Sequence, residues 1–420
     1  MRKIILKLTL MNISLFKPKS YMPYVTVLIF FLLAFLVYFV TQPKTENPFN
    51  YFIYLAEAFL NGRLNVLDTP FYFEELINKN GEFYTIYPPM PALLLIPFVA
   101  IWGKVFSQVL ASLILGAVNV SLVYLLMRRL TEKLDIQIWI TVLFGFGTIY
   151  WYTAGIGSVW YLAQIASLFF LILAIYETFG ARRPLLIGLL LGASYWSRIP
   201  VILSFPFFLI MLSDQWLIRE RTGSILRRIR IKPILFLFVG VGVFVLLNFL
   251  YNYLRFGSPF DVAYSLHEIS AAKERVSPWF NKGLFNLSYL KHHLYIFLLH
   301  PPAIIDTWPY IVPSKVGLSV LITTPIFIFA FFAGIRNRFS LACWSAILPI
   351  ALLIFTKSGS GWTQFGYRYA LDFYPFLLLL TFRGIGSEIK WYHKLLIIMG
   401  VLVNLWGVLF INKFEWFKLY

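Results

Sequence analysis

Long apolar runs alternate with short basic segments along most of the 420-residue chain, and this pattern predicts a protein that crosses a membrane many times. A helix needs about 20 apolar residues to cross roughly 30 Å of hydrocarbon. About eleven runs approach that length, at residues 22–41, 105–127, 136–153, 158–178, 184–197, 199–213, 234–254, 318–335, 341–356, 369–383 and 395–412. We therefore expect an all-α, polytopic integral membrane protein with one membrane-embedded domain over residues 1–420.

A shorter, proline-rich apolar run at residues 88–102 decides the predicted topology. If this run does not cross the membrane, every basic cluster falls on the same side as the N-terminus. Basic loop residues accumulate on the cytoplasmic side of membrane proteins. We therefore expect a cytoplasmic N-terminus, a partly inserted or interfacial helix at 88–102, and three extracytoplasmic loops, named loop 1 (41–87), loop 2 (255–317) and loop 3 (357–368).

The composition excludes an ordinary soluble domain. Hydrophobic residues make up 60% of the chain and charged residues 13%, whereas a soluble domain carries about 25% charged residues. The net charge of +18 lies between the apolar runs, where it orients the chain, so we expect membrane lipids as partners and no nucleic acid. The first run is too long for the core of a signal peptide, and we expect it to be retained as a span in the cell membrane.

Neither disulfide nor metal chemistry is indicated. Cys343 is the single cysteine of the sequence, which excludes an internal disulfide. His292 and His293 are adjacent, so their side chains would point about 100° apart on a helix, and no acid sits at the spacing of a metal ligand. We therefore expect no metal site and no cofactor.

Loop 1 holds a third of the acids in a chain in which cations outnumber acids by 36 to 18. These acids are Glu46, Glu57, Asp68, Glu74, Glu75 and Glu82. A carboxylate near a low-dielectric surface can be tuned to act as a general base. Their concentration in one polar loop of an apolar chain predicts an active-site loop on a membrane scaffold.

Residues 50–61 of loop 1 predict an amphipathic helix on the membrane surface. Polar side chains recur on one helical face, at Asn50, Tyr54, Glu57 and Asn61. The opposite face carries Phe52, Leu55, Ala56 and Phe59. Pro48 suits the start of the helix and Gly62 its C-terminal cap.

The polar face of this helix has two interpretations. It would either line a cavity, presenting Glu57 as a general base with Asn50 and Tyr54 as substrate contacts, or simply face water. Glu46, a few residues beyond the first apolar run, is a similar candidate for the base.

Two arginines are candidates for binding an anion. Arg198 lies between two short apolar runs with no other charge nearby in sequence, and an arginine within a bilayer costs roughly 2.5–3.5 kcal/mol on insertion scales. Arg368 ends a glycine- and aromatic-rich stretch in loop 3, and its guanidinium offers fork-shaped recognition of phosphate. The alternatives are a snorkelling Arg198 and a structural turn with an interfacial Arg368.

Four segments in order along the chain resemble a known family. They are residues 50–64 (NYFIYLAEAFLNGRL), 87–92 (YPPMPA), 197–200 (SRIP) and 361–369 (GWTQFGYRY). The chain resembles the polytopic membrane glycosyltransferases that use polyprenyl-phosphate sugars, the superfamily of protein O-mannosyltransferases and lipid A aminoarabinose transferases. Tyr87, which opens the second segment, is a further substrate-binding candidate.

The resemblance implies an enzyme that takes a sugar from a polyprenyl-phosphate carrier. It would pass the sugar, with inversion, to a lipid, glycan or protein acceptor on the extracytoplasmic face. An acid of loop 1 would deprotonate the acceptor hydroxyl, while cations such as Arg198 and Arg368 would hold the leaving phosphate.

The sequence departs from the family at one position. Better-known members begin the surface helix with an aspartate, and here Pro48 occupies that place. The base therefore stays open between Glu57 and Glu46, and a non-catalytic member is a further possibility. A lipid-linked sugar transporter or flippase and a polysaccharide polymerase or ligase are the alternative functions, although no internal repeat typical of transporters is present.

Overall fold

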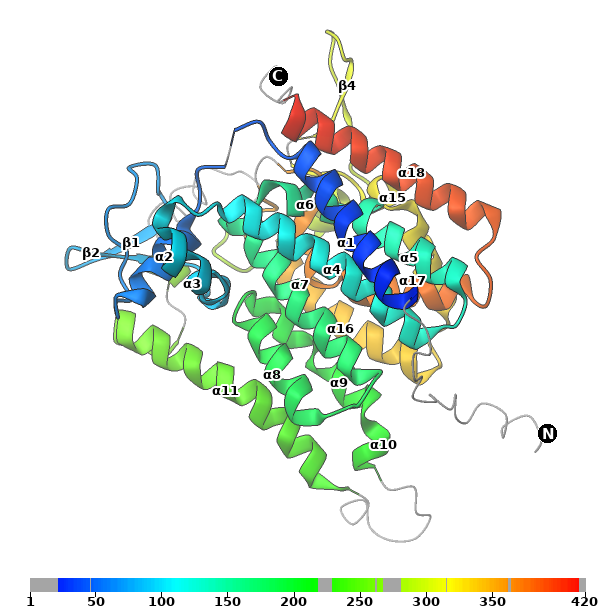
Figure 1. The fold of residues 1–420 in the computed structure, drawn as a ribbon, viewed down its shortest axis with the longest axis horizontal. Coiled ribbons are helices and arrows are strands. Elements are labelled where there is room, and N and C mark those ends of the chain that lie inside the picture. The colour runs from blue at the N-terminus through cyan, green and yellow to red at the C-terminus, as the bar shows by residue number, and fades with distance from the viewer. Residues whose placement is uncertain are drawn as a thin grey trace.

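The computed structural model describes residues 22–45, 47–217, 229–260, 263–266, 281–314, 316–361 and 364–414, and these residues are mostly helical (Figure 1). Among them, six helices are long and apolar enough to cross a membrane, namely α1 (Met22–Thr41), α4 (Gln108–Leu130), α7 (Val159–Thr178), α11 (Ile231–Phe256), α16 (Arg338–Phe355) and α18 (Trp391–Val408). The count becomes seven if α5 (Leu134–Phe146) and α6 (Tyr150–Ile156), which meet at a bend of 50°, form one broken span. The chain is therefore a multi-pass membrane protein.

The described residues thus contain six or seven candidate spans, whereas the sequence predicted about eleven. The remaining apolar runs fold into shorter pieces, which are α8 (Pro184–Tyr195), the 3-10 segment η3 (Ile199–Ser204), α9 (Phe205–Met211), α15 (Val320–Thr323), the 3-10 segment η6 (Pro325–Ala333) and α17 (Tyr374–Ile385). At 1.5 Å per residue, the 12 residues of α8 reach only about 18 Å. Proline begins several of these pieces, because it fits the first turn of a helix and interrupts a longer one.

The helices α8 and α11 approach each other unusually closely. A Cβ atom added to Gly188 of α8 would lie 2.3 Å from the Leu237 carbonyl oxygen, and one added to Gly240 of α11 would lie 2.5 Å from the Leu185 carbonyl oxygen. Glycine at both contact points lets the two backbones touch, which is a common means of packing helices in membranes. The contact fixes the position of α8, whose C-terminal end leads directly to Arg198.

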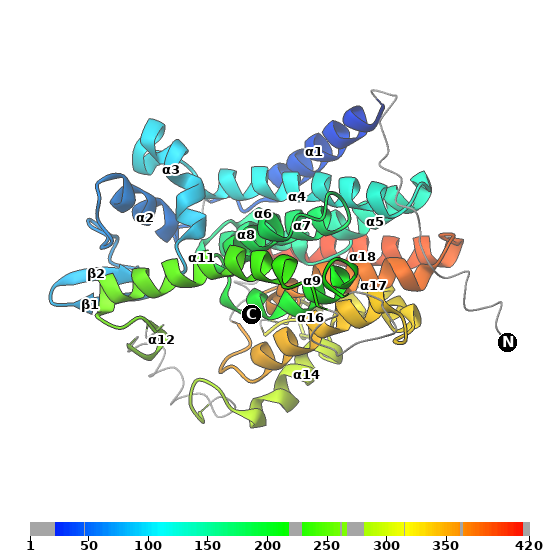
Figure 2. The same cartoon turned by 90° about the horizontal axis from the view of Figure 1, so that it is seen from below.

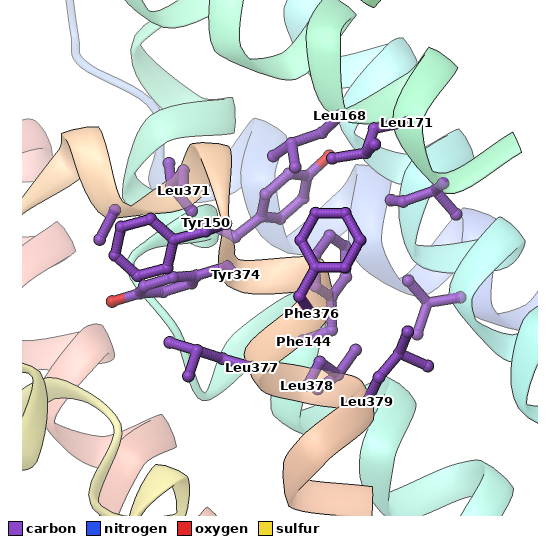
Figure 3. Close-up of a cluster of buried hydrophobic side chains, with 14 of the residues drawn as sticks. Phe144, Tyr150, Leu168, Leu171, Leu371, Tyr374, Phe376, Leu377, Leu378 and Leu379 are labelled. Atoms are coloured by element: carbon purple, nitrogen blue, oxygen red, sulfur yellow. The ribbon is translucent and has the colours of Figure 1, made fainter. Parts of the chain in front are cut away.

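A buried apolar cluster joins α5, α6, α7 and α17 (Figure 3). Phe144 and Tyr150 pack there with rings 4.4 Å apart, and Phe376 of α17 is fully buried. Leu371 belongs to the same cluster and lies on η7 (Arg368–Asp372), the 3-10 segment immediately before α17. Close packing of this cluster therefore holds η7, and with it Arg368, against the rest of the fold.

Loop 1 contains secondary structure beyond the predicted helix. Strands β1 (Leu76–Lys79) and β2 (Glu82–Thr85) form an antiparallel hairpin, which lies near α2 (Tyr51–Leu60) and α3 (Met90–Trp102) at one end of the helices (Figure 1). Its turn is Asn80-Gly81, with φ angles of 55° and 84°, the dipeptide that two-residue hairpin turns favour. Together with the short pair β3 (Ala303–Ile304) and β4 (Ile311–Val312), the hairpin corrects the predicted all-α class to mostly helical.

Helix α2 keeps the predicted faces. Its polar stripe is partly or fully exposed, at Asn50, Tyr54, Glu57 and Asn61, whereas Phe52, Leu55 and Ala56 are fully buried. The helix ends at Leu60 with Asn61 as its C-cap, one residue before the predicted Gly62, which follows with a positive φ of 68°. The Gly62 N–H donates to the Phe59 carbonyl at 3.1 Å, and the Arg63 N–H donates to the Ala58 carbonyl at 2.8 Å. However, α2 is covered by other parts of the chain over most of its surface, so it is more deeply embedded than a helix lying alone on a membrane.

The run at 88–102 forms a helix, α3, of 13 residues. Its length of about 20 Å falls short of the roughly 30 Å of a bilayer core, because each helical residue adds 1.5 Å. This length agrees with the expectation that the run does not cross, while its depth in the membrane stays a prediction.

Candidate functional site

The backbones of loop 2 and loop 3 lie side by side. Phe285 and Lys357 form an antiparallel bridge, flanked by hydrogen bonds from Asn286 N–H to the Thr356 carbonyl (2.7 Å) and from Ser358 N–H to the Leu284 carbonyl (2.8 Å). Helix α14 (Leu290–Leu298) of loop 2 lies beside α16, whose end leads into loop 3 (Figure 2). Two stretches far apart in sequence therefore build one surface.

Loop 1 is attached to the beginning of loop 2 through Arg255. This buried residue at the end of α11 donates from Nη1 to the Thr85 carbonyl at 2.7 Å. In return, Lys79 Nζ donates to the Arg255 carbonyl at 3.0 Å. The β1–β2 hairpin is thus held to α11 by both strands.

Three cations surround the ring of Tyr369, and we call Arg198, Lys357 and Arg368 the cationic cluster. The Arg368 guanidinium carbon lies 5.2 Å from the ring centroid, Lys357 Nζ 5.5 Å and the Arg198 guanidinium carbon 5.7 Å. They come from η7, from the residue pair following α16 and from the turn after α8. The structure therefore brings together the two arginines that the sequence singled out, and adds Lys357.

Arg198 is paired with a carboxylate that is distant in sequence, that of Asp372. Its Nε and Nη2 atoms donate to the two carboxylate oxygens of Asp372 at 3.0 and 2.7 Å, a bidentate pair. The Asp372 side chain is only 2% exposed and that of Arg198 18%. This ion pair offsets the charge of Arg198 and ties the α8 turn to η7.

Arg368 is the most distinctive residue of the cationic cluster. It is 7% exposed, and its guanidinium lies 4.9 Å from the centre of the Tyr161 ring. Its buried Nε has no hydrogen-bond partner among the described residues. Because buried polar groups are almost always satisfied, an unpaired guanidinium N–H in a cationic environment is what an anion-binding site requires.

The cations also change the acidity of Tyr369, which precedes the apolar helix α17. Burial alone would raise the pKa of its phenol, but Lys357, Arg368 and Arg198 outweigh burial and lower it from 10.0 to about 8. The phenolate is therefore within reach near neutral pH.

His293 of α14 fastens loop 3 to loop 2. Its Nε2 lies 2.8 Å from the Lys357 carbonyl, which can only accept, so Nε2 carries the hydrogen and Nδ1 accepts from the Tyr367 hydroxyl at 2.8 Å. Burial lowers the pKa of His293 to about 4, so the ring is neutral at physiological pH. The sequence analysis weighed His293 only as a metal ligand and rejected that role. It did not predict that His293 holds Lys357 and Tyr367 in place.

In the part of the chain that the structure describes, no group of three or more histidine, cysteine, aspartate or glutamate side chains could hold a metal ion.

Glu57, the first candidate for the base, makes its contacts within the last turn of α2. Its Oε1 accepts from Asn61 Nδ2 at 2.8 Å and from Arg63 Nη2 at 3.0 Å, and the side chain is 22% exposed. Both partners lie within six residues of Glu57, so this carboxylate is part of the local structure that closes the helix. Glu46, the second candidate, lies outside the described residues.

The other predicted contacts of loop 1 have different surroundings. Asn50 occupies the N-cap of α2 without capping it through its side chain, and Tyr54 lies beneath Lys104, with Nζ 5.0 Å from the ring centre. Tyr87 is 5% exposed and packs edge-on against Tyr51, and its hydroxyl has no partner within the described ranges. Tyr87 thus lies inside the loop 1 core.

Glu75 is a candidate that sequence reasoning passed over. Its Oε2 accepts from the Trp160 indole N–H at 2.9 Å, and the next residue of α7 is Tyr161, whose ring faces Arg368. The first turn of α7 therefore connects an acid of loop 1 to the cationic cluster. Glu75 lies in irregular structure before β1, so no helical period could separate it from its neighbours.

Comparisons with known proteins inform the fold. No family model and no curated protein matches the sequence. The structure is similar to the crystal structure of ArnT from Cupriavidus metallidurans bound to undecaprenyl phosphate, with a TM-score of 0.55 at 12% identity, covering 88% of this chain and 62% of ArnT. The apo state of the same protein gives a TM-score of 0.48 at 11% identity, covering 89% of this chain and 62% of ArnT.

The chain spans 62% of the length of ArnT, an aminoarabinose transferase of the superfamily that the four sequence segments resemble. The resemblance is therefore confirmed at the level of the fold, over most of the chain.

Proposed function

We propose that this protein is a membrane glycosyltransferase. It transfers a sugar from a polyprenyl-phosphate carrier, with inversion, to a lipid, glycan or protein acceptor on the extracytoplasmic face. The observation that carries the proposal is the buried Arg368, whose Nε is unpaired among the described residues and which stands beside Lys357 and Arg198. The ArnT-like fold supports it, because that relative was crystallised with undecaprenyl phosphate.

The cationic cluster provides the electrostatics for this reaction. As the bond between the sugar and the phosphate breaks, the leaving phosphate gains negative charge, which fixed cations stabilise more than they stabilise the donor. Arg368 binds the phosphate oxygens through its fork and Lys357 as a point charge. Arg198 adds charge while Asp372 holds it in position.

An acid of loop 1 takes the proton of the acceptor hydroxyl in this proposal. Glu57 and Glu46 remain proposed for the role, with Asn50, Tyr54 and Tyr87 as proposed substrate contacts. Glu75 joins them, because its partner Trp160 is followed by Tyr161, whose ring faces Arg368, whereas the side-chain hydrogen bonds of Glu57 go to Asn61 and Arg63.

A transfer assay tests the phosphate assignment. Purified protein in lipid, supplied with isotope-labelled polyprenyl-phosphate sugar, should release the carrier phosphate or label an acceptor. Arg368→Ala should abolish the reaction, whereas the exposed Arg336→Ala should not. Full activity of Arg368→Ala would overturn the assignment, and labelled donor that crosses the bilayer unchanged would favour a flippase.

The same assay identifies the base. Replacing the base by its amide should lower turnover by about 10²–10⁴-fold, so Glu57→Gln, Glu46→Gln and Glu75→Gln are compared with the exposed neighbour Glu74→Gln as control. Wild-type turnover in all three would show that the base lies elsewhere.

Tags on either side of residues 88–102 test the proposed orientation. Access to both tags from outside agrees with three extracytoplasmic loops, whereas opposite accessibility would make the run a span and invert the sides.

A further inference from the structure

The ring of Tyr369 lies among the three cations of the proposed phosphate site. We propose that phosphate binding at the cationic cluster is coupled to the uptake of one proton by Tyr369. In alkaline solution the phenolate balances the cations when the site is empty, and the phosphate balances them when it is filled. This inference rests on the proposed function, since it uses the same phosphate site.

The geometry supports the exchange. The three cations lie 5.2–5.7 Å from the centre of the half-buried ring and arrive from three separate segments of the chain. Arg198 is already paired with Asp372. Arg368, whose Nε is unpaired among the described residues, is thus the main cation whose charge either the phenolate or the phosphate would balance.

Other ionisable groups also face this site. Tyr152 of α6 and Tyr161 of α7 face Arg368, and their hydroxyls lie 3.2 Å apart. Tyr367 lies 6.1 Å from Tyr369, ring to ring, and donates to His293, whose pKa of about 4 keeps it neutral across the relevant range. The pKa of about 8 places Tyr369 at the edge of physiological pH.

The proton balance is simple. An O–H bond forms on Tyr369 with a proton from solvent, and no bond of the phosphate breaks. Below about pH 8 the empty site already holds the proton, so Tyr369 should add no pH dependence to the affinity. Above about pH 8 binding must take up the proton, so affinity should fall by up to about tenfold per pH unit.

Calorimetric titration with farnesyl phosphate in lipid nanodiscs tests the coupling. The second pKa of a phosphate monoester is about 6, so the probe is a dianion from about pH 7.5 upward and does not itself titrate. Wild type should show the falling affinity, and buffers of different ionisation heat should report an uptake that approaches one proton. Tyr369→Phe should keep the affinity near pH 7.5 within about threefold, since the ring remains, and should lose the pH slope.

Tyr161→Phe is the matched control, because it removes another phenol that faces Arg368. It should keep the slope. A slope that persists in Tyr369→Phe, or that disappears in Tyr161→Phe, assigns the proton to another group and overturns the proposal.

Two further outcomes separate this inference from the proposed function. Binding of farnesyl phosphate to wild type with no pH slope overturns the coupling and leaves the phosphate site standing. Absence of binding at every pH overturns both. The ligand-free protein should also show a tyrosine that ionises near pH 8 in its ultraviolet titration and that Tyr369→Phe lacks, and absence of this transition overturns the coupling independently of any ligand.

Discussion

Two clusters of this molecule contain arginines in different surroundings: one around Asp214, and the cationic cluster around Tyr369. In the first cluster, Oδ1 of Asp214 in α10 (Ser213–Trp216) accepts hydrogen bonds from Arg182 Nη2 at 2.6 Å and Arg338 Nη2 at 2.5 Å. All three side chains are at least 28% exposed. In the cationic cluster Arg368 is only 7% exposed, and it keeps an unpaired N–H within the described residues. Arginines that enclose an acid complete a structural contact, whereas a buried arginine with a spare donor is prepared for a ligand.

The largest expected difference between the clusters concerns activity. Arg368→Lys keeps the charge but loses the fork, so we expect turnover to fall by about 10²–10³-fold, the usual loss for one donor to a developing oxyanion. The equivalent change Arg338→Lys should leave turnover near wild type. Transfer of labelled sugar at saturating donor measures both, and equal losses would remove the functional distinction.

The next difference concerns stability. Asp372→Asn leaves Arg198 without its charged partner in a largely buried place, and breaking such a pair costs about 3–5 kcal/mol, less here because Arg198 is 18% exposed. Denaturant titration of the protein in detergent should show a loss of about 2–3 kcal/mol. No loss would mean that the pair does not fasten η7.

Asp214→Asn should have a smaller effect on the same titration. The carboxylate is 47% exposed and water replaces part of the lost interaction, so a loss of about 1 kcal/mol or less is expected. A loss as large as that of Asp372→Asn would show that exposure does not separate the two clusters.

The smallest effect is the pH dependence of the Asp214 cluster. Although burial opposes its charge, hydrogen bonds from Arg182 and Arg338 hold the pKa of Asp214 below its ordinary value. A lowered folded-state pKa gives stability that is complete above the ordinary value of about 3.9 and is lost as pH falls below it. Wild type should therefore lose more stability than Asp214→Asn between about pH 5 and about pH 3.

Local patterns predicted the parts of the fold that depend on local sequence. The first span was placed at 22–41, where α1 lies, and the 3.6-residue period found both faces of α2. The Asn80-Gly81 dipeptide also carried a hairpin signal that could have been used. Hydropathy failed where proline divides an apolar run, as at Pro206 and Pro325, because it measures polarity and not helix continuity.

The candidate site was harder to predict because its partners are distant in sequence. Arg198 and Asp372 are 174 residues apart, and the hydroxyl of Tyr367 reaches His293 across 74 residues. Sequence could nominate Arg198 for its isolation and Arg368 for its glycine-rich surroundings. It could not pair them around Tyr369, and Glu75 had no periodic neighbours to distinguish it.

Trp160 and Tyr161 are consecutive residues, yet one contacts Glu75 and the other faces Arg368. A displacement of this first turn of α7 would move both contacts together. A ligand that orders one contact reduces the entropic cost of ordering the other, and such coupling is reciprocal by thermodynamic necessity. In the proposed transferase reaction, the donor and the acceptor should thus bind cooperatively, because the contacts of two neighbouring rings couple their sites.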